Sequence, residues 1–234
     1  MALNRAAARR ALPGRGGLSY ITAGWLMTAL LIALLLVPGT VRAHAETNDW
    51  TFRVLLDGRQ IGRHRFLLRG EGDEDLELRS EMQVDVRVLL VTVYHYRHEA
   101  IERWHGNCLR SLVSHTDNNG TRESVNAAAE GELLTVERAR AVEEHSGCIM
   151  SFAYWNPQIL RARRLLNNET GELLPVSITP HGTETVTVHG EPLSASRYRI
   201  SAPKLQIDLW YAGDLWVGLE AVAEGGRRLR YELM

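Results

Sequence analysis

The sequence predicts an all-β fold with a minor α part, built as a large curved antiparallel sheet that forms a half-barrel or a barrel meander. Two observations support this class: about a dozen short strand-like segments follow one another at hairpin spacing, and only residues 157–164 carry a convincing helix signal. A sheet of this size must curl or fold into layers, because otherwise its apolar face would meet water.

Turn signals divide the chain into hairpins. Alternating runs flank Asp57-Gly58, and glycine supplies the positive φ that a tight hairpin turn requires. Asn119-Gly120 is a second signal of the same kind. Glycine and proline continue to separate short apolar runs as far as the end of the chain, so we expect the meander to continue there.

The apolar pattern indicates which faces of the strands are buried. Residues 76–86 and 205–211 alternate between apolar and polar side chains, which predicts one buried face and one wet face for each strand. Residues 88–96 are more uniformly apolar. This is typical of a strand buried on both sides, or of the wall of an apolar cavity.

The central stretch, residues 148–160, combines a thiol, three aromatic side chains and a helix start. Asn156 is a favourable N-cap residue and Pro157 suits the first helical position, so a short helix is expected to begin here. Aromatic side chains bury on the order of 150–250 Å² each. We therefore expect those of this stretch to plug one end or edge of a sheet; the alternative is that Tyr154, Trp155 and Asn156 line a ligand mouth.

Residues 1–45 have the composition of a secretory signal peptide. Arginines without acidic residues precede the apolar run 21–37, Pro38-Gly39 breaks the helix, and Ala43-His44-Ala45 supplies the small residues of a cleavage site. The run of 17 residues is at the lower limit for crossing a bilayer, so an uncleaved anchor is the alternative. Residues 46–234 are expected to form a single β domain that is periplasmic or secreted, or anchored in the inner membrane and facing the periplasm.

Charge argues against a nucleic-acid partner. The chain contains 27 Lys+Arg and 28 Asp+Glu, and the leader holds five arginines and no acidic residue. Residues 46–234 therefore have 22 basic and 28 acidic residues, a net charge of −6. Nucleic-acid binding requires a basic surface that neutralises phosphates. A membrane is expected as a partner only through the N-terminal segment, if that segment is retained.

Cys108 and Cys148 both lie in the part that is expected to be exported. An even pair without CxxC spacing in an oxidising compartment predicts first a structural disulfide. Two separate buried thiols, or a redox or catalytic thiol, are the alternatives. A bridge that closes a loop of about 40 residues stabilises a fold by roughly 4 kcal/mol in the chain-entropy model.

The sequence contains no nucleophile elbow, HExxH motif, paired-cysteine metal site or phosphate loop. His95 and His98 suggest a metal site, but residues three apart in a strand point to opposite faces. We therefore predict no metal, no cofactor and no catalytic residue. An enzyme would need at least two polar candidates to converge in one pocket. The candidates are His64, Glu102, Asp117 and Asn156.

Blocks of sequence spread over residues 46–234 carry a family resemblance. The blocks are Asp57-Gly58 with Ile61-Gly62-Arg63-His64, Glu102-Arg103-Trp104 with Cys108-Leu109, Thr116-Asp117-Asn118-Asn119-Gly120, Leu165-Leu166-Asn167, Thr170-Gly171 and, most specific, Phe152-Ala153-Tyr154-Trp155-Asn156-Pro157. Together they resemble an uncharacterised family of exported bacterial proteins, a domain of unknown function, which implies no activity. A second resemblance rests on the closing pattern Ile207-Asp208-Leu209-Trp210-Tyr211, Leu215-Trp216-Val217 and Leu229-Arg230-Tyr231-Glu232-Leu233. This pattern is similar to curved-sheet periplasmic proteins of the lipoprotein-carrier type, which is a likeness of fold.

The function that we predict from these observations is a periplasmic binding or carrier module for an apolar or lipid-like ligand. Its motivation is the apolar run in residues 88–93 together with several aromatic side chains. The alternatives are an envelope enzyme of unknown reaction and a structural or assembly protein that binds a protein partner. The predicted ligand-binding residues are Tyr154, Trp155, Asn156 and Trp210.

Overall fold

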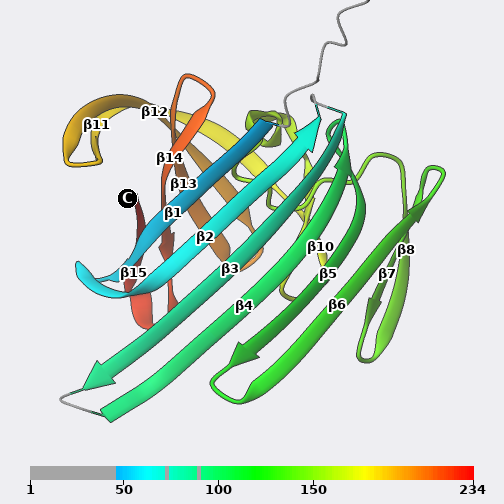
Figure 1. The fold of residues 1–234 in the computed structure, drawn as a ribbon, viewed down its shortest axis with the longest axis horizontal. Coiled ribbons are helices and arrows are strands. Elements are labelled where there is room, and N and C mark those ends of the chain that lie inside the picture. Colours follow the sequence, from blue (N-terminus) through cyan, green and yellow to red (C-terminus); the bar gives the residue numbers. More distant parts are fainter. Residues whose placement is uncertain (1–45, 72–73, 89–90) are drawn as a thin grey trace, which may run out of the picture. The chain divides into compact units, whose positions relative to one another are not determined.

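The computed structural model describes residues 46–71, 74–88 and 91–234, and the predicted leader lies outside them. Within these residues the chain forms a 13-stranded antiparallel sheet and a separate two-stranded sheet (Figure 1). The strand order of the large sheet is β11-β12-β13-β14-β15-β1-β2-β3-β4-β5-β6-β7-β8. Its outer strands, β11 and β8, do not pair with each other, so the sheet is not closed. The all-β prediction with one large antiparallel sheet is confirmed.

The elements follow one another mostly as hairpins. The strands are β1 (Glu46–Leu56), β2 (Arg59–Glu71), β3 (Asp75–Val88), β4 (Val91–His105), β5 (Cys108–Asn118), β6 (Thr121–Glu130), β7 (Leu133–Arg138), β8 (Ala141–Ser146), β9 (Arg164–Leu166), β10 (Leu173–Pro175), β11 (Ser177–Val188), β12 (Glu191–Ala202), β13 (Leu205–Ala212), β14 (Leu215–Val222) and β15 (Arg228–Leu233). Two short 3₁₀ segments, η2 (Pro157–Arg161) and η3 (Glu224–Gly226), complete the described part. No helix in it is long and apolar enough to cross a membrane.

The predicted hairpin turns are present. Asp57 and Gly58 have φ values of 50° and 79°, and Asn119 and Gly120 have 50° and 94°. Two successive residues in the left-handed region give the backbone twist that matches paired strands. The first turn joins β1 to β2 and the second joins β5 to β6, as the sequence predicts.

The strand register shows how the core is built, because directly paired residues of antiparallel strands share a face. One row of paired residues crosses the sheet from β13 to β4, and the face that bears it is called the inner face below. The row consists of Leu209, Leu219, Tyr231, Val54, Gly62, Val84 and Tyr96. The outer face, by contrast, carries ion pairs such as Asp49–Arg65 and Glu77–Arg103.

Residues 147–176, called the central segment below, leave the large sheet and pack on its inner face. The backbone N–H of Leu109 in β5 donates to the carbonyl oxygen of Ile149 at 2.8 Å. On the other half of the sheet, the Tyr211 hydroxyl in β13 donates to the carbonyl oxygen of Tyr154 at 2.6 Å. The central segment therefore bridges two distant parts of the sheet, and its aromatic residues Phe152 and Trp155 are buried, as predicted for a plug.

Three local predictions are corrected by the structure. The helix expected over residues 157–164 is the shorter 3₁₀ segment η2, because β9 already begins at Arg164. The described part of the uniformly apolar run, residues 91–96, is not buried on both sides, since Val91 and Val93 are 64% and 52% exposed. In β13 the face expected to be wet is only partly so: Gln206 is exposed, but Asp208 is buried because Arg197 and Arg199 pair with it.

A disulfide joins Cys108 at the start of β5 to Cys148 at the start of the central segment. The predicted pairing is therefore confirmed. Because the bridge closes a separation of 40 residues, it restricts the unfolded chain strongly. It also holds the entry of the central segment against the sheet that the segment covers.

The double variant Cys108→Ala/Cys148→Ala should lose about 2–4 kcal/mol of unfolding free energy, because its unfolded chain is no longer cross-linked. Urea denaturation followed by tryptophan fluorescence measures this loss. A reductant should lower the midpoint of the wild-type protein and leave that of the variant unchanged. Equal midpoints for the oxidised wild type and the variant would contradict a stabilising role of the bridge.

Candidate functional site

A cavity of about 700 Å³ lies on the inner face, within the range of about 300–1,000 Å³ that is usual for small-molecule sites. Strands β1 to β5, strands β13 to β15 and the central segment contribute its walls. Most of the lining side chains are aliphatic or aromatic. The polar exceptions are Asn118, Asn167, Asn168, Glu169 and Arg227.

One row of paired residues supplies a continuous apolar part of the wall. Ile207 pairs with Ala221, Ala221 with Leu229, and Leu229 with Leu56, across β13, β14, β15 and β1. All four line the cavity. Because paired residues share a face, the wall follows directly from the strand order and register.

The central segment contributes aromatic and polar groups to the same cavity. The ring of Tyr154 packs between those of Trp216, at 5.4 Å, and Phe152, at 6.2 Å. Glu169 lies beside them in the lining, and burial raises the pKa of its carboxyl, while the Tyr96 hydroxyl lowers it by hydrogen bonding. The side-chain oxygen of Asn167 accepts from the backbone N–H of Glu169 at 2.8 Å, which fixes this turn.

Of the four residues predicted to bind a ligand, only Tyr154 lines the cavity. Trp155 is buried against Trp104, with the ring centroids 5.6 Å apart. Asn156 caps η2, accepting from the backbone N–H of Gln158 at 2.9 Å and donating to Asn107. These two side chains therefore have structural contacts away from the cavity.

Trp210 lies on the outer face, because it alternates along β13 with inward-facing residues and pairs with Arg197. Two guanidinium groups, of Arg197 and Arg230, lie 5.4 and 5.9 Å from its ring. Its indole Nε1–H donates to Glu184 at 3.2 Å. Trp210 thus belongs to a cation–π and ion-pair cluster on the side of the sheet opposite the cavity.

Glu102 is a buried carboxyl on the inner face, with neighbours Leu78 and Leu112 in its row. It accepts hydrogen bonds from Trp104 Nε1 at 3.1 Å, from Ser151 Oγ at 3.1 Å and from Asn168 Nδ2 at 3.4 Å. Burial raises the pKa of Glu102 to about 7, although these three donors act in the opposite direction. Glu102 therefore fastens two places of the central segment to β4.

His64 and His98 are buried and share the inner face with Glu102. Met82 on β3 lies between them, because it pairs with His64 on β2 and with His98 on β4. His64 contacts Ser80 at 2.7 Å and the Tyr231 hydroxyl at 3.1 Å, and His98 contacts Thr116 at 2.8 Å. Burial lowers the pKa of His64 well below its usual range and that of His98 to about 4. Both rings are therefore neutral at physiological pH.

The four polar residues considered for an enzyme do not meet in one hydrogen-bond network. His64 and Glu102 have the separate partners described above, and none of the four lines the cavity. Asp117 lies at the β5–β6 turn, where it accepts from Gly120 N at 2.8 Å. His95 contacts Asp117 and is on the face opposite His98, as expected for residues three apart in a strand.

The residues that form most of the cavity were not identified individually from the sequence. Tyr96 and Tyr231 line it together, although they lie on β4 and β15, strands that are far apart in the sequence. Besides the prediction of Tyr154, the uniformly apolar segment 88–96 gave a usable signal, because a cavity wall was among its two interpretations. Its residues Val93, Tyr94 and Tyr96 do line the cavity.

The fold and the cavity define a class: an open, curved antiparallel sheet with an apolar cavity on its inner face. The chain belongs to the family described as Domain of unknown function (DUF6134), which matches residues 52–234. A crystal structure of a beta-barrel-like protein of domain of unknown function DUF1849 from Brucella abortus is similar in fold. It superposes with a TM-score of 0.60 at 11% identity, covering 80% of this chain and 95% of that chain. No curated protein matches the sequence.

The raised pKa of Glu102 predicts a specific pH dependence of stability. The carboxyl titrates near its ordinary pKa of 4.5 when the chain is unfolded and at about 7 when it is folded. Its contribution to stability is therefore complete below pH 4.5 and is lost as the pH rises through 7. At about 1.36 kcal/mol per pKa unit, the loss is roughly 3 kcal/mol.

The variant Glu102→Gln isolates this effect, because it lacks the carboxyl that ionises. His64 and His98 are present in both proteins, so their own pH dependence cancels when the two are compared. The difference in unfolding free energy, wild type minus variant, should decrease between pH 4.5 and pH 8. Urea denaturation at several pH values measures it. A difference that stays constant over this range would show that Glu102 is not the titrating group.

Proposed function

We propose that the protein is a binding or carrier module that holds an apolar or lipid-like ligand in the inner-face cavity. The observation that supports this is the cavity itself, whose lining is aliphatic and aromatic apart from a few polar residues. Removing apolar surface from water is worth roughly 25 cal/mol per Å². A hydrocarbon ligand would cover aliphatic surface that the chain's own side chains leave uncovered.

The shape of the interior supports a binding function over a purely structural one. The central segment fills the part of the inner face near Trp104 and Glu102, where buried side chains are closely packed. It leaves a cavity towards Ile207, Leu219 and Leu229. The cavity is open to solvent, and its size and mostly apolar lining are those of a small-molecule site, which supports a ligand there.

We infer that the protein works outside the cytoplasm, in the periplasm or as a secreted protein, with an anchored form as the alternative. The Cys108–Cys148 bridge supports this, because structural disulfides persist in oxidising compartments. The sequence of residues 1–45 supports it independently, since it has the charge and apolar pattern of a signal peptide.

Substitution of Ala221 by Trp should block the cavity, since Ala221 lies in the apolar row between Ile207 and Leu229. We expect this variant to bind a neutral apolar fluorophore, N-phenyl-1-naphthylamine, at least about tenfold more weakly than the wild type, a loss of about 1.4 kcal/mol. Fluorescence titration measures the Kd, and circular dichroism checks that the variant is folded.

The matched control is Ala128→Trp, which places the same side chain on an exposed position of β6, away from the cavity. This control should bind the fluorophore as the wild type does. Equal Kd values for folded Ala221→Trp and wild type, or no binding to the wild type, would contradict the proposed function.

A further inference from the structure

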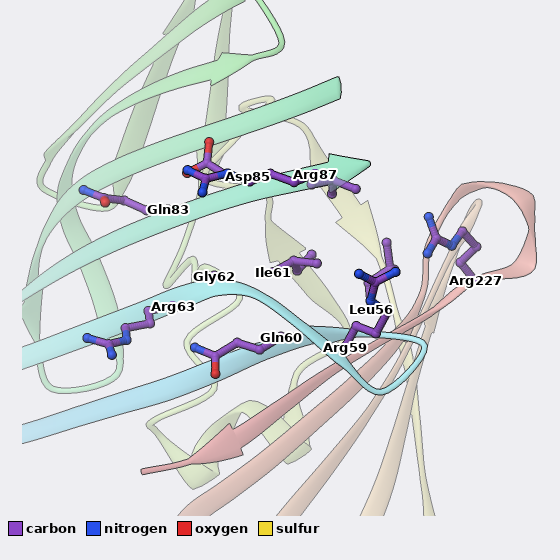
Figure 2. Close-up of a pocket in the computed structure, with 11 residues that line it drawn as sticks. Leu56, Arg59, Gln60, Ile61, Gly62, Arg63, Gln83, Asp85, Arg87 and Arg227 are labelled. Carbon is purple, nitrogen blue, oxygen red and sulfur yellow. The ribbon is translucent and has the colours of Figure 1, made fainter. Parts of the chain in front are cut away.

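A second cavity, of about 600 Å³, adjoins the apolar one at the end formed by the β1–β2 turn, the end of β3 and the start of β15 (Figure 2). The two cavities share four lining residues: Leu56, Ile61, Val86 and Arg227. They are therefore neighbouring parts of one continuous surface. The composition changes along it, because the second cavity is lined mostly by polar and charged side chains.

Arginine dominates the charged lining of this second cavity. Arg59, Arg63, Arg87 and Arg227 line it, against a single carboxylate, that of Asp85. Asp85 is engaged elsewhere, since its two oxygens accept from Arg97 Nη2 at 3.2 and 3.0 Å. The second cavity thus has a net positive lining although residues 46–234 as a whole are acidic.

The strand register places one of these arginines directly beyond the apolar wall. Leu56 ends the apolar row that begins at Ile207, and its partner on β2 is Arg59. The row therefore passes from hydrocarbon side chains to a guanidinium on the same face of the sheet. Figure 2 shows Arg59 next to Leu56, Arg227 on the neighbouring turn, and Arg87 next to Asp85 on β3; the three arginines come from separate segments of the chain.

The guanidinium groups are available to a ligand. Arg59 and Arg87 are exposed, and among the side chains that the structure describes neither forms an ion pair. Arg227 donates through Nε to Asp57 at 2.8 Å, which orients the group and leaves its terminal nitrogens without an ion-pair partner among those side chains. A guanidinium binds carboxylate and phosphate groups through parallel N–H donors, so this arrangement suits an anionic group.

The side of the apolar cavity that the central segment forms has the reverse character. Glu169 lines it there, with the side chains of Asn167, Asn168 and Tyr154 from the same central segment. A partly buried carboxyl does not attract an anion. An amphiphile therefore has one favourable orientation, with its hydrocarbon chain between the sheet and the central segment and its charged group at the arginines.

We propose that the ligand is an anionic amphiphile, an aliphatic chain with a carboxylate or phosphate headgroup that Arg59, Arg87 and Arg227 bind at the end of the apolar cavity. This inference rests on the proposed function, because it identifies the ligand class of the same cavity. Carboxylate and phosphate headgroups share the chemistry that the arginines recognise. The experiment below distinguishes a carboxylate headgroup from a phosphate headgroup.

The experiment compares four ligands with the same twelve-carbon chain: dodecanoate, dodecyl phosphate, neutral dodecyl maltoside and cationic dodecyltrimethylammonium. Each displaces N-phenyl-1-naphthylamine from the purified protein at concentrations below micelle formation. We expect at least one of the two anions to bind about tenfold or more tightly than the neutral ligand, and that preference to decrease with added salt. The tighter of the two anions identifies the headgroup.

The variant Arg59→Gln/Arg87→Gln should lose the preference for anions and keep the affinity for the neutral ligand. Both positions are exposed, so the fold should be unaffected, and a thermal melt checks this. The matched control is Arg140→Gln in the β7–β8 turn, which is exposed and does not line either of the two cavities. It should leave the preference for anions intact.

Equal affinities for anionic and neutral ligands, or an unchanged preference in the double variant, would overturn this inference and leave the proposed function standing. Failure of all four ligands to bind the wild type would overturn the proposed function together with the inference. Tightest binding of the cationic ligand would also overturn the inference, since it would assign the headgroup to Glu169 instead of the arginines.

Discussion

The structure depends on how the inner face of an open sheet is covered. A sheet of 13 strands that does not close leaves a large apolar face, and in this protein the central segment covers it. The segment is attached by contacts of different kinds: a disulfide at its start, hydrogen bonds from Ser151 and Asn168 to the buried carboxyl of Glu102, and one from the Tyr211 hydroxyl on the other half of the sheet.

The central segment does not cover the whole inner face, and the uncovered part forms the apolar cavity. Near Trp104 the segment packs against the sheet as a hydrophobic core does, with Trp155, Ile159 and Leu165 buried. Towards β13, β14 and β15 the segment contributes only one side of a cavity. A dense core and an apolar cavity on the same face are thus two consequences of one arrangement. The buried ionisable groups contribute to the dense part, where burial disfavours charge on Glu102, His64 and His98.

Local sequence signals predicted the features that depend on neighbouring residues. Asp57-Gly58 and Asn119-Gly120 make hairpin turns because the backbone conformation is set within two residues. Asn156 caps η2 for the same reason. The disulfide followed from there being two cysteines in a chain expected to be exported. The short length of η2 was not predictable, because β9 begins at Arg164 through pairing with β10, and the pairing is not visible in the sequence of residues 157–164.

The site depends on contacts between distant strands, and there the sequence was less informative. Tyr154 was identified because its neighbours mark an unusual segment. Trp210 was expected at the ligand, but the register of β12 and β13 puts it with Arg197 on the outer face. Arg59 and Arg227 line one cavity only because β15 pairs with β1 and brings the two ends of the domain together. No sequence pattern around Arg59 or around Arg227 indicates that the two residues are neighbours.

The location of a bound chain tests the account most directly. Methyl-labelled protein, with isotopic labels at isoleucine, leucine and valine, would be titrated with dodecanoate and followed by NMR. The account predicts that the methyl signals of Ile207, Leu219 and Val86 shift with one common Kd, and that exposed Val142 on β8 does not respond. Absence of shifts at these cavity methyls, or shifts confined to exposed residues such as Val142, would contradict it.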